Sequence, residues 1–262
     1  LEELRKRLWV GLVLVVAGIV AAYVFRSRLL VFLLEPLSWA WNRVLVEGAS
    51  IPAEPMIHYR SMTEPFFTDL KVAFLGGLWV GVPLFAWQVW LFVAPGLMPR
   101  EKRYALPFLF FSYLFFTAGM YFCWRAVLPV AYRFFFDYAA GMKAGVTVNP
   151  TLMLNDFVSL SVKMMAAFGL VFQLPLVSCL LTIAHVVDWR MLVKNLRWAI
   201  VAAFVVGGVL TPTPDPASQL MMAVPLLVLY LLSIVLSFAL WPMGKPRPSK
   251  VGKGTGGDGK KG

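Results

Sequence analysis

Residues 72–93 read VAFLGGLWVGVPLFAWQVWLFV, a run of 22 residues that contains no charged side chain. A helix of about 20 apolar residues is long enough to cross the hydrocarbon core of a bilayer. The whole chain agrees with this run, because 60% of its 262 residues are hydrophobic and only 14% are charged. Soluble domains average about 25% charged residues. The composition therefore excludes an ordinary soluble enzyme and predicts a polytopic membrane protein.

Six apolar stretches of this kind predict an all-α protein with six transmembrane helices in one domain, residues 1–240. The predicted spans are Leu8–Phe25, Val72–Val93, Tyr104–Trp124, Phe157–Ala184, Trp198–Leu210 and Leu220–Leu240. The fifth stretch has 13 residues and reaches only about 20 Å, so we expect the fifth and sixth helices to be the short ones. Residues 241–262 are rich in Gly, Lys and Pro and are predicted to form a disordered, basic cytoplasmic tail.

Lysine and arginine are distributed unevenly between the two sets of segments that alternate with the spans. One set holds 15 of them in 51 residues and the other holds nine in 94. The first set is 1–7, 95–103, 185–197 and 241–262, and the second is 26–71, 125–163 and 211–219. Because Lys and Arg accumulate in cytoplasmic loops, both termini are predicted to be cytoplasmic, in a multi-pass protein of the cytoplasmic (inner) membrane. The net charge of +11 then reflects loops that face anionic lipid, and no nucleic-acid partner is predicted.

The external segments 26–71 and 125–156 are too long and too apolar to be simple connections. The first contains an apolar run near Leu29–Leu34, and the second contains the aromatic cluster around Phe134–Phe136. We therefore predict that these external loops form short helices that cap the external face.

Two carboxylates lie at predicted cytoplasmic helix ends. Glu3 precedes the first span, and Glu101 lies in the short turn between the second and third spans. A carboxylate can accept both arms of a guanidinium, so two of them on one face could bind a pair of arginines. Alternatively, each carboxylate simply balances the Arg and Lys beside it. Spacing alone favours this second explanation.

Polar and glycine residues inside the spans have two possible roles. Gln173 lies deep in the fourth span, where its amide must find a partner, so it could line a pathway or hydrogen-bond a neighbouring helix. Pro175 predicts a kink at that point. Gly77 and Gly81 form a GxxxG pattern that predicts close helix packing. In the proline-rich turn 211–219, Asp215 could cap the sixth helix or serve a functional site.

No enzyme chemistry is predicted. The sequence has no metal-ligand spacing and no nucleophile–base pair. The GxGxxG match at residues 252–257 follows no strand and opens no helix, so no cofactor is predicted. The two cysteines of the chain, Cys123 and Cys179, lie at different predicted depths and are not expected to pair. A secondary transporter of a small solute, with Gln173 and Lys163 at a midplane site, is the alternative from another class. The absence of a clear internal repeat argues against it.

Several short motifs occur in one order along the chain, and together they resemble the TatC family, the multispanning core subunit of the twin-arginine protein translocase. The motifs run from residue 3 to residue 219. They are Glu3-Leu-Arg-Lys-Arg7, Pro65-Phe-Phe with Lys71, Gln88-Val-Trp-x-Phe-x-x-Pro95, Glu101-x-Arg103, Phe168-Gly, Phe172-Gln-x-Pro175, Leu210-Thr-Pro-x-Pro-Asp215 and Ser218-Gln219. Each motif is weak by itself, and their common order makes the resemblance specific.

The resemblance implies a receptor and scaffold for signal peptides that carry two consecutive arginines. It implies TatA and TatB, single-span proteins, as partners, a homo-oligomer in the receptor complex, and export of folded proteins driven by the protonmotive force. The residues to which it assigns roles fall into three sets. They are Glu3, Arg5, Phe92, Glu101 and Arg103 for signal-peptide binding, Val209, Leu210 and Gln219 for docking of partner helices, and Pro36, Phe66 and Asp215 as structural positions of the external face. Many family members carry a glutamate where this chain has Gln173, so we expect a hydrogen-bond anchor there and no proton transfer.

Overall fold

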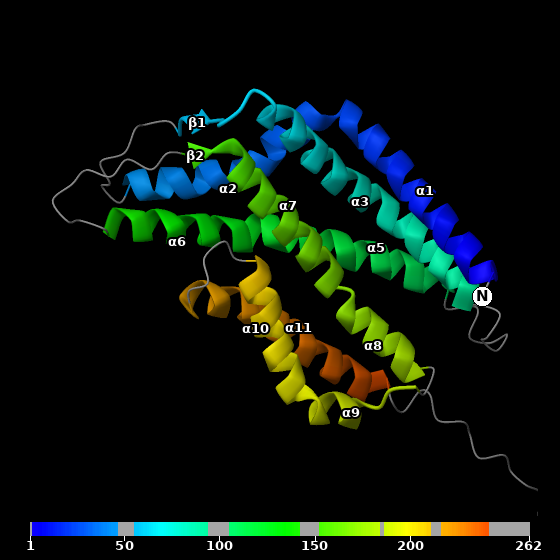
Figure 1. Cartoon of the computed structure of the whole chain (residues 1–262). Coiled ribbons are helices and arrows are strands. Elements are labelled where there is room, and N and C mark those ends of the chain that lie inside the picture. Colours follow the sequence, from blue (N-terminus) through cyan, green and yellow to red (C-terminus); the bar gives the residue numbers. More distant parts are fainter. Residues whose placement is uncertain are drawn as a thin grey trace, which may run out of the picture.

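The computed structural model describes residues 2–46, 55–93, 105–141, 152–183, 186–210 and 216–240. Within these ranges the chain is almost entirely helical (Figure 1), as the apolar sequence requires, because a bilayer offers no water to satisfy backbone N–H and C=O groups. The helices are α1 (Glu2–Val24), α2 (Arg26–Val46), α3 (Glu64–Val93), α5 (Ala105–Phe122), the π-helical turn η2 (Cys123–Val127), α6 (Leu128–Gly141), α7 (Leu154–Val171), α8 (Leu174–Ile183), α9 (Trp189–Lys194), α10 (Leu196–Leu210) and α11 (Pro216–Leu240). Two short strands, β1 (Ile57–His58) and β2 (Leu152–Met153), pair in parallel.

Helices α1 and α3 form a close antiparallel pair, so the start of α1 lies beside the end of α3 (Figure 1). Glycines make this approach possible. An added Cβ on Gly77 would lie 2.5 Å from the Cα of Ile19, and one on Gly18 would lie 3.1 Å from the carbonyl oxygen of Gly77. On Gly81, the added carbon would lie 2.8 Å from a methyl group of Val15. The close packing predicted from the GxxxG pattern is therefore confirmed.

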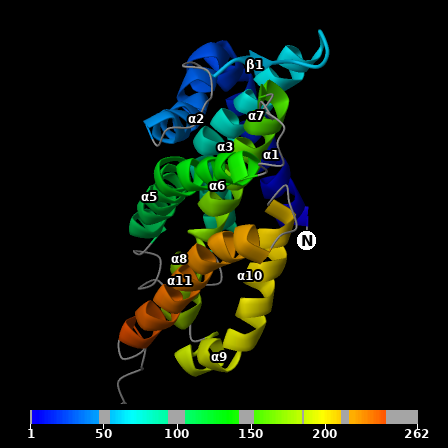
Figure 2. The same ribbon diagram turned by 90° about the vertical axis from the view of Figure 1, so that its left-hand side faces the viewer.

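By length and composition, six helices of the described ranges can cross a membrane, which agrees with the predicted number. The six differ from the predicted set, however, because they include α2 and omit the short α10. The prediction of short helices in segment 26–71 was therefore wrong for α2, which has 21 residues. It turns away from α1 at Phe25 and packs beside α6 (Figures 1 and 2). Arginines at its two ends and Pro36 in its middle made this helix resemble a loop in the sequence.

The interior proline of α2 is accommodated by a contact from another helix. Pro36 has no N–H, so the carbonyl of Phe32, four residues earlier, lacks its usual helical donor. The indole N–H of Trp124 donates to that carbonyl over 2.9 Å, and the two aromatic rings stack with centroids 4.4 Å apart. Pro36 itself is buried. The acceptor that Pro36 leaves free is therefore used by Trp124 of η2.

The third predicted span continues beyond its predicted end at Trp124. Helices α5 and α6 run as one rod through η2 (Figure 1), where the N–H of Leu128 donates to the carbonyl of Cys123, five residues earlier. A hydrogen bond between residues five positions apart defines a π-turn, in which the helix gains one residue in that turn and continues without a break. Segment 125–156 therefore contributes a helix continuous with the third span, and α6 is joined to α2 by side-chain packing.

The fourth predicted span is divided into α7 and α8 at Phe172 and Gln173. The cause is Pro175, which cannot donate to the carbonyl of Val171. The backbone N–H of Gln173 donates to the carbonyl of Leu170, three residues earlier, over 3.0 Å, and the helix resumes at Leu174. The predicted kink is therefore confirmed.

Helix α10 is short, as predicted, with 15 residues and a length of about 22 Å. The prediction that the sixth helix is also short was wrong, because α11 has 25 residues. The apolar run Leu220–Leu240 already has 21 residues, and the helix begins one turn earlier, at Pro216, a favourable first helical residue. The predicted disordered tail, 241–262, lies outside the described residues.

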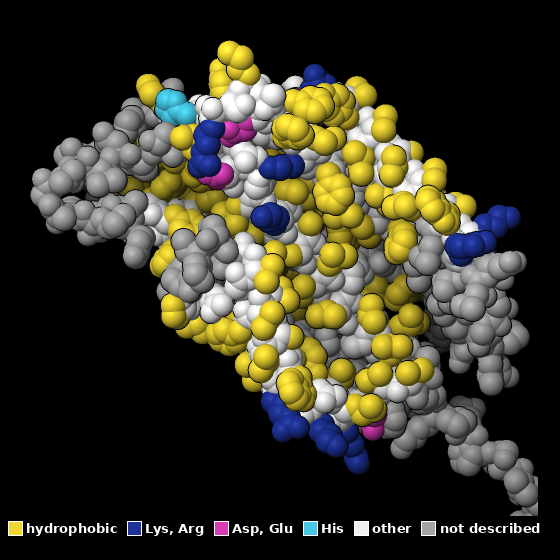
Figure 3. All heavy atoms as spheres, viewed as in Figure 1, with side chains coloured by type: hydrophobic (Ala, Val, Ile, Leu, Met, Phe, Trp, Pro, Cys, Tyr) yellow, Lys and Arg dark blue, Asp and Glu magenta, His cyan; other side chains and the backbone are white. Residues whose placement is uncertain are grey.

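The hydrophobic core lies between α2, α5, α6 and α7, and its largest fully buried side chains are Phe116, Tyr132 and Phe168. Outside this core, hydrophobic side chains cover the flanks of the helices, while Lys and Arg gather toward the ends (Figure 3). Such exposed apolar flanks suit a lipid environment, in which they remain in contact with acyl chains.

Candidate functional site

Three of the five residues predicted to bind a signal peptide lie at the same end of the molecule. Glu3 and Arg5 lie in the first two turns of α1, and Phe92 lies in the last turn of α3, which ends beside them (Figure 1). The Arg5 side chain is exposed. Glu101 and Arg103 lie outside the described residues, in the segment that joins the end of α3 to the start of α5. The side chains of Glu3 and Phe92 are also outside the description.

A second basic group lies on α9 and the first turn of α10, at the lower edge of Figure 3. Arg190 lies over the ring of Trp189 and Arg197 over that of Trp198, at 5.5 and 5.8 Å from the ring centroids. Asp188 caps α9 by accepting from the amide of Arg190 over 3.3 Å. Paired Trp and Arg side chains of this kind are typical of a membrane–water interface.

Gln173 forms a two-point clamp on helix α5. Its side-chain N–H donates to the Ser112 carbonyl over 2.8 Å, and its side-chain oxygen accepts from the Ser112 hydroxyl over 3.0 Å. Ser112 is buried and Gln173 is half-buried. Of the two alternatives for this residue, the hydrogen bond to a neighbouring helix is therefore present, and it ties the break between α7 and α8 to α5.

The predicted docking residues lie where α10 packs against α11. Val209 is 76% exposed in the last turn of α10, and Leu210 beside it is half-buried. Gln219 is half-buried and packs over the two glycines of α10, Gly207 and Gly208, whose missing side chains make room for it. The α10–α11 corner thus exposes the apolar side chain of Val209, on the short helix α10, beside the side-chain amide of Gln219.

The three residues predicted to be structural positions of the external face differ in their surroundings. Pro36 is buried and frees the carbonyl described above. Phe66 is 57% exposed in the first turn of α3 and meets the ring of Phe67 edge to face, with centroids 5.6 Å apart. Asp215 lies outside the described residues.

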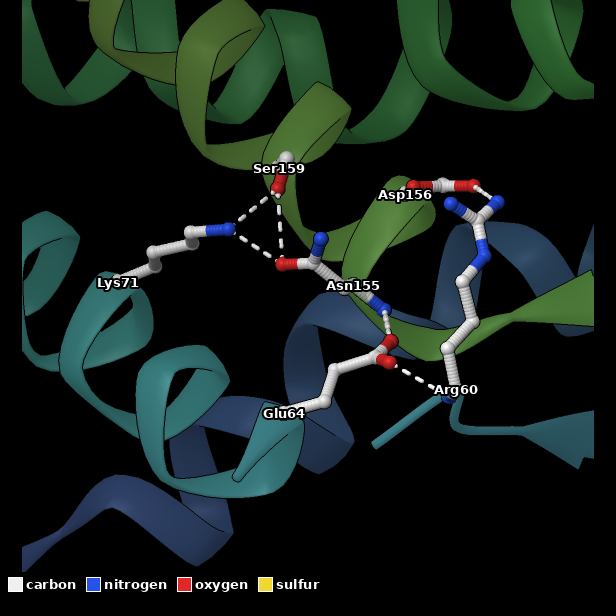
Figure 4. Close-up of polar contacts among 6 residues, drawn as sticks. All are labelled: Arg60, Glu64, Lys71, Asn155, Asp156 and Ser159. Carbon is white, nitrogen blue, oxygen red and sulfur yellow. Dashed lines mark hydrogen bonds and ion pairs between the residues drawn. The ribbon is translucent and has the colours of Figure 1, made fainter. Parts of the chain in front are cut away.

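A polar cluster joins the start of α3 to the start of α7, and the sequence analysis did not predict it (Figure 4). Glu64 is its centre: one carboxylate oxygen accepts from the amide of Asn155 over 3.0 Å, and the other accepts from the amide of Arg60 over 2.6 Å. Asn155 is in the first turn of α7, where amides lack helical acceptors. A side chain of α3 therefore caps α7.

Two further contacts close this cluster. The Arg60 guanidinium donates to Asp156 over 2.8 Å. The ammonium group of Lys71 donates to the side-chain oxygen of Asn155 and, over 2.8 Å, to the hydroxyl of Ser159. Together with the pairing of β1 and β2, these bonds fix α3 against α7 at the end opposite the start of α1 (Figure 1).

Sequence reasoning missed this cluster because the contacts that join its two halves link residues between 84 and 96 positions apart. The lysine was noted only as part of a motif, and nothing local indicates that it meets α7. The two cysteines, in contrast, behave as predicted, since Cys123 and Cys179 are both free thiols.

The chain is similar to known proteins in both sequence and structure. A family model described as Sec-independent protein translocase protein (TatC) matches residues 1–225. The chain belongs to the TatC family. It is 34% identical to the TatC of Deinococcus radiodurans over 90% of the chain and 83% of that protein, and 34% identical to the TatC of Carboxydothermus hydrogenoformans over 92% of both. A crystal structure of the twin arginine translocase receptor TatC superposes with a TM-score of 0.78 at 30% identity, covering 91% of this chain and 97% of that one.

The TatC-family resemblance drawn from short motifs is thus confirmed. All the residues to which it assigned roles lie in the part that the family model matches. Family membership identifies the chain as a component of a protein translocase, a role that depends on binding surfaces. The surfaces to consider are therefore the α1–α3 end, the Gln173 clamp and the α10–α11 corner.

Proposed function

We propose that this TatC-family chain is the twin-arginine signal-peptide receptor and scaffold of a Tat translocase in the cytoplasmic membrane. The observation that supports the proposal is the antiparallel packing of α1 on α3, which places Glu3, Arg5 and Phe92 at the same end of the molecule. Segment 94–104, which carries Glu101 and Arg103, starts from this end. In the proposal, this end and both termini are cytoplasmic, in accord with the distribution of Lys and Arg.

Carboxylates are well suited to distinguish arginine from lysine. A guanidinium offers parallel N–H groups that match both oxygens of a carboxylate, whereas an ammonium is a point charge without that geometry. Glu3 and Glu101 each bind one arginine of the pair in this mechanism. Arg5 and Arg103 add positive charge to the site, so they repel peptides whose positive charge the two carboxylates cannot neutralise. Phe92 packs against the apolar residues that follow the arginine pair.

The remaining surfaces are assigned to the later steps. TatA and TatB helices dock at the corner formed by Val209, Leu210 and Gln219, and Gln173 anchors the bundle near the path of the signal peptide. Helix α10 reaches about 22 Å, less than the roughly 30 Å core of a bilayer, so the membrane is thin beside the docking corner. Folded cargo crosses there with energy from the protonmotive force, in a receptor complex that contains several copies of this chain.

The test is the binding of a synthetic twin-arginine signal peptide to the purified protein in detergent, compared with the same peptide carrying two lysines. We expect the arginine peptide to bind at least about tenfold more tightly, since one charge-assisted hydrogen bond contributes about 1.5–3 kcal/mol. The double variant E3A/E101A is expected to lose this preference. The matched control is E35A, which removes an exposed carboxylate from α2. Equal binding of both peptides to the wild type would refute the receptor assignment.

A further inference from the structure

A hollow lined by arginines lies between α2, η2, α6 and the start of α11. Its volume is about 560 Å³. Helices α2 and α6 and the start of α11 lie on the left of Figure 1, whereas the proposed signal-peptide site lies at the opposite end, where α1 begins. The residues that line the hollow and carry the argument are Trp39, Arg43, Arg125, Val130, Arg133 and Met221.

Three guanidinium groups reach this hollow from three separate elements. Arg43 is exposed in the last turn of α2, Arg125 is exposed in η2, and Arg133 is half-buried in α6. Among the described residues that line the hollow, one is acidic: Asp137, which pairs with Arg133 over 3.4 Å. These four side chains carry a net charge of +2, and like charges gathered in one place repel each other until an anion joins them.

The position of Arg125 is fixed by a chain of aromatic contacts. Its guanidinium lies over the ring of Trp39, 4.8 Å from the centroid. Trp39 meets Trp124 edge to face at 4.9 Å, and Trp124 is held by the Phe32 carbonyl that Pro36 leaves without a helical donor. The π-turn that carries Arg125 is a feature found often at functional sites. This arginine is thus held in place before any ligand arrives.

The chemistry of the hollow fits a phosphate group attached to an apolar chain. Guanidinium groups bind phosphate oxygens through parallel N–H groups. Beside the arginines, the lining includes apolar side chains, among them Val130, which is 52% exposed, and Met221, which is half-buried. A soluble phosphate would use only the basic part of this surface. We propose that the hollow binds an anionic phospholipid, with Arg43 and Arg125 on its phosphate and Val130 and Met221 along its acyl chains.

The test is a lipid titration of the purified full-length protein in detergent, followed by native mass spectrometry. The probes are dioleoyl phosphatidylglycerol, dioleoyl phosphatidylcholine and glycerol phosphate. Each arginine near an anionic headgroup contributes about 1 kcal/mol, which corresponds to about fivefold in affinity. We therefore expect phosphatidylglycerol to bind about fivefold more weakly to R43Q and about 25-fold more weakly to R43Q/R125Q. Phosphatidylcholine should bind wild type and variants alike, and more weakly than phosphatidylglycerol binds the wild type.

The matched control is R28Q, which removes an exposed arginine from the same helix outside the hollow and should leave affinity unchanged. V130E keeps both arginines and places a carboxylate at the exposed edge, so it should weaken phosphatidylglycerol binding even if R43Q/R125Q fails to fold. Unchanged binding to V130E and to a folded arginine variant would overturn the proposal. Competition by glycerol phosphate at concentrations equal to the lipid would also overturn it, since the site would then bind soluble phosphates.

Discussion

Replacing Gly77 with alanine tests how closely α1 and α3 approach each other. The new Cβ would lie 2.5 Å from the Cα and 2.6 Å from the backbone nitrogen of Ile19. Carbon atoms in contact prefer about 3.5–4.0 Å, so the helices must separate by about 1 Å. A gap of that size forfeits about a quarter to a half of each contact energy. Overpacking usually costs about 1–3 kcal/mol, and we expect the upper end because no side-chain rotation relieves a backbone clash.

The measurement is thermal unfolding in detergent, followed in a C179S background by a maleimide dye that reacts with buried Cys123 as it becomes exposed. A change of 1 kcal/mol shifts the midpoint of a soluble chain of 150–250 residues by about 2–4 °C, so G77A should lower it by roughly 6–12 °C. G81A should have a smaller effect, because the atom nearest its new carbon is a side-chain methyl of Val15. A17V adds carbon atoms to an exposed position of α1 and should be neutral. A G77A midpoint equal to that of A17V would refute the close approach.

Three other contacts lead to measurable expectations. Q173L removes both hydrogen bonds to Ser112 and should cost about 1–3 kcal/mol; in a thermal-unfolding cycle, Q173L/S112A should be less than additive, and full additivity would contradict the clamp. E64A removes the cap of α7, worth about 1 kcal/mol, so hydrogen exchange in the first turn of α7 should rise by about fivefold, and E64Q should rise less. W124F leaves the Phe32 carbonyl without its donor and should lower the unfolding midpoint by several degrees; an unchanged midpoint would mean that this hydrogen bond contributes nothing.

The spans could be predicted because hydropathy alone identifies a segment that must lie in lipid. Helix α3 contains no charge from Val72 to Val93, and its end was predicted to the residue. Helix α2 was not recognised as one long helix, because its arginines and Pro36 are typical of loops. Only the tertiary structure reveals that Trp124 supplies the missing donor.

Some features of the candidate sites could also be predicted from the sequence, and others could not. The kink at Pro175 follows from the chemistry of a single residue and was predicted. Spacing alone favoured the view that Glu3 and Glu101 balance their neighbours, and family resemblance was needed to assign them a ligand. The cluster around Glu64 could not be predicted, because Asn155 is 91 residues away and capping between helices leaves no local pattern.

The uninterrupted rod of α5, η2 and α6 links the two ends of the molecule mechanically. It begins at Ala105, directly after the segment that carries Glu101 and Arg103, and ends at Gly141, four residues after Asp137 of the arginine hollow. At 1.5 Å per residue it is about 55 Å long. A tilt of about 5° around one end of such a lever moves the other end by about 5 Å. A ligand that tilts the rod by this amount about its Ala105 end would therefore move Gly141 by about 5 Å, without any change within the helix itself.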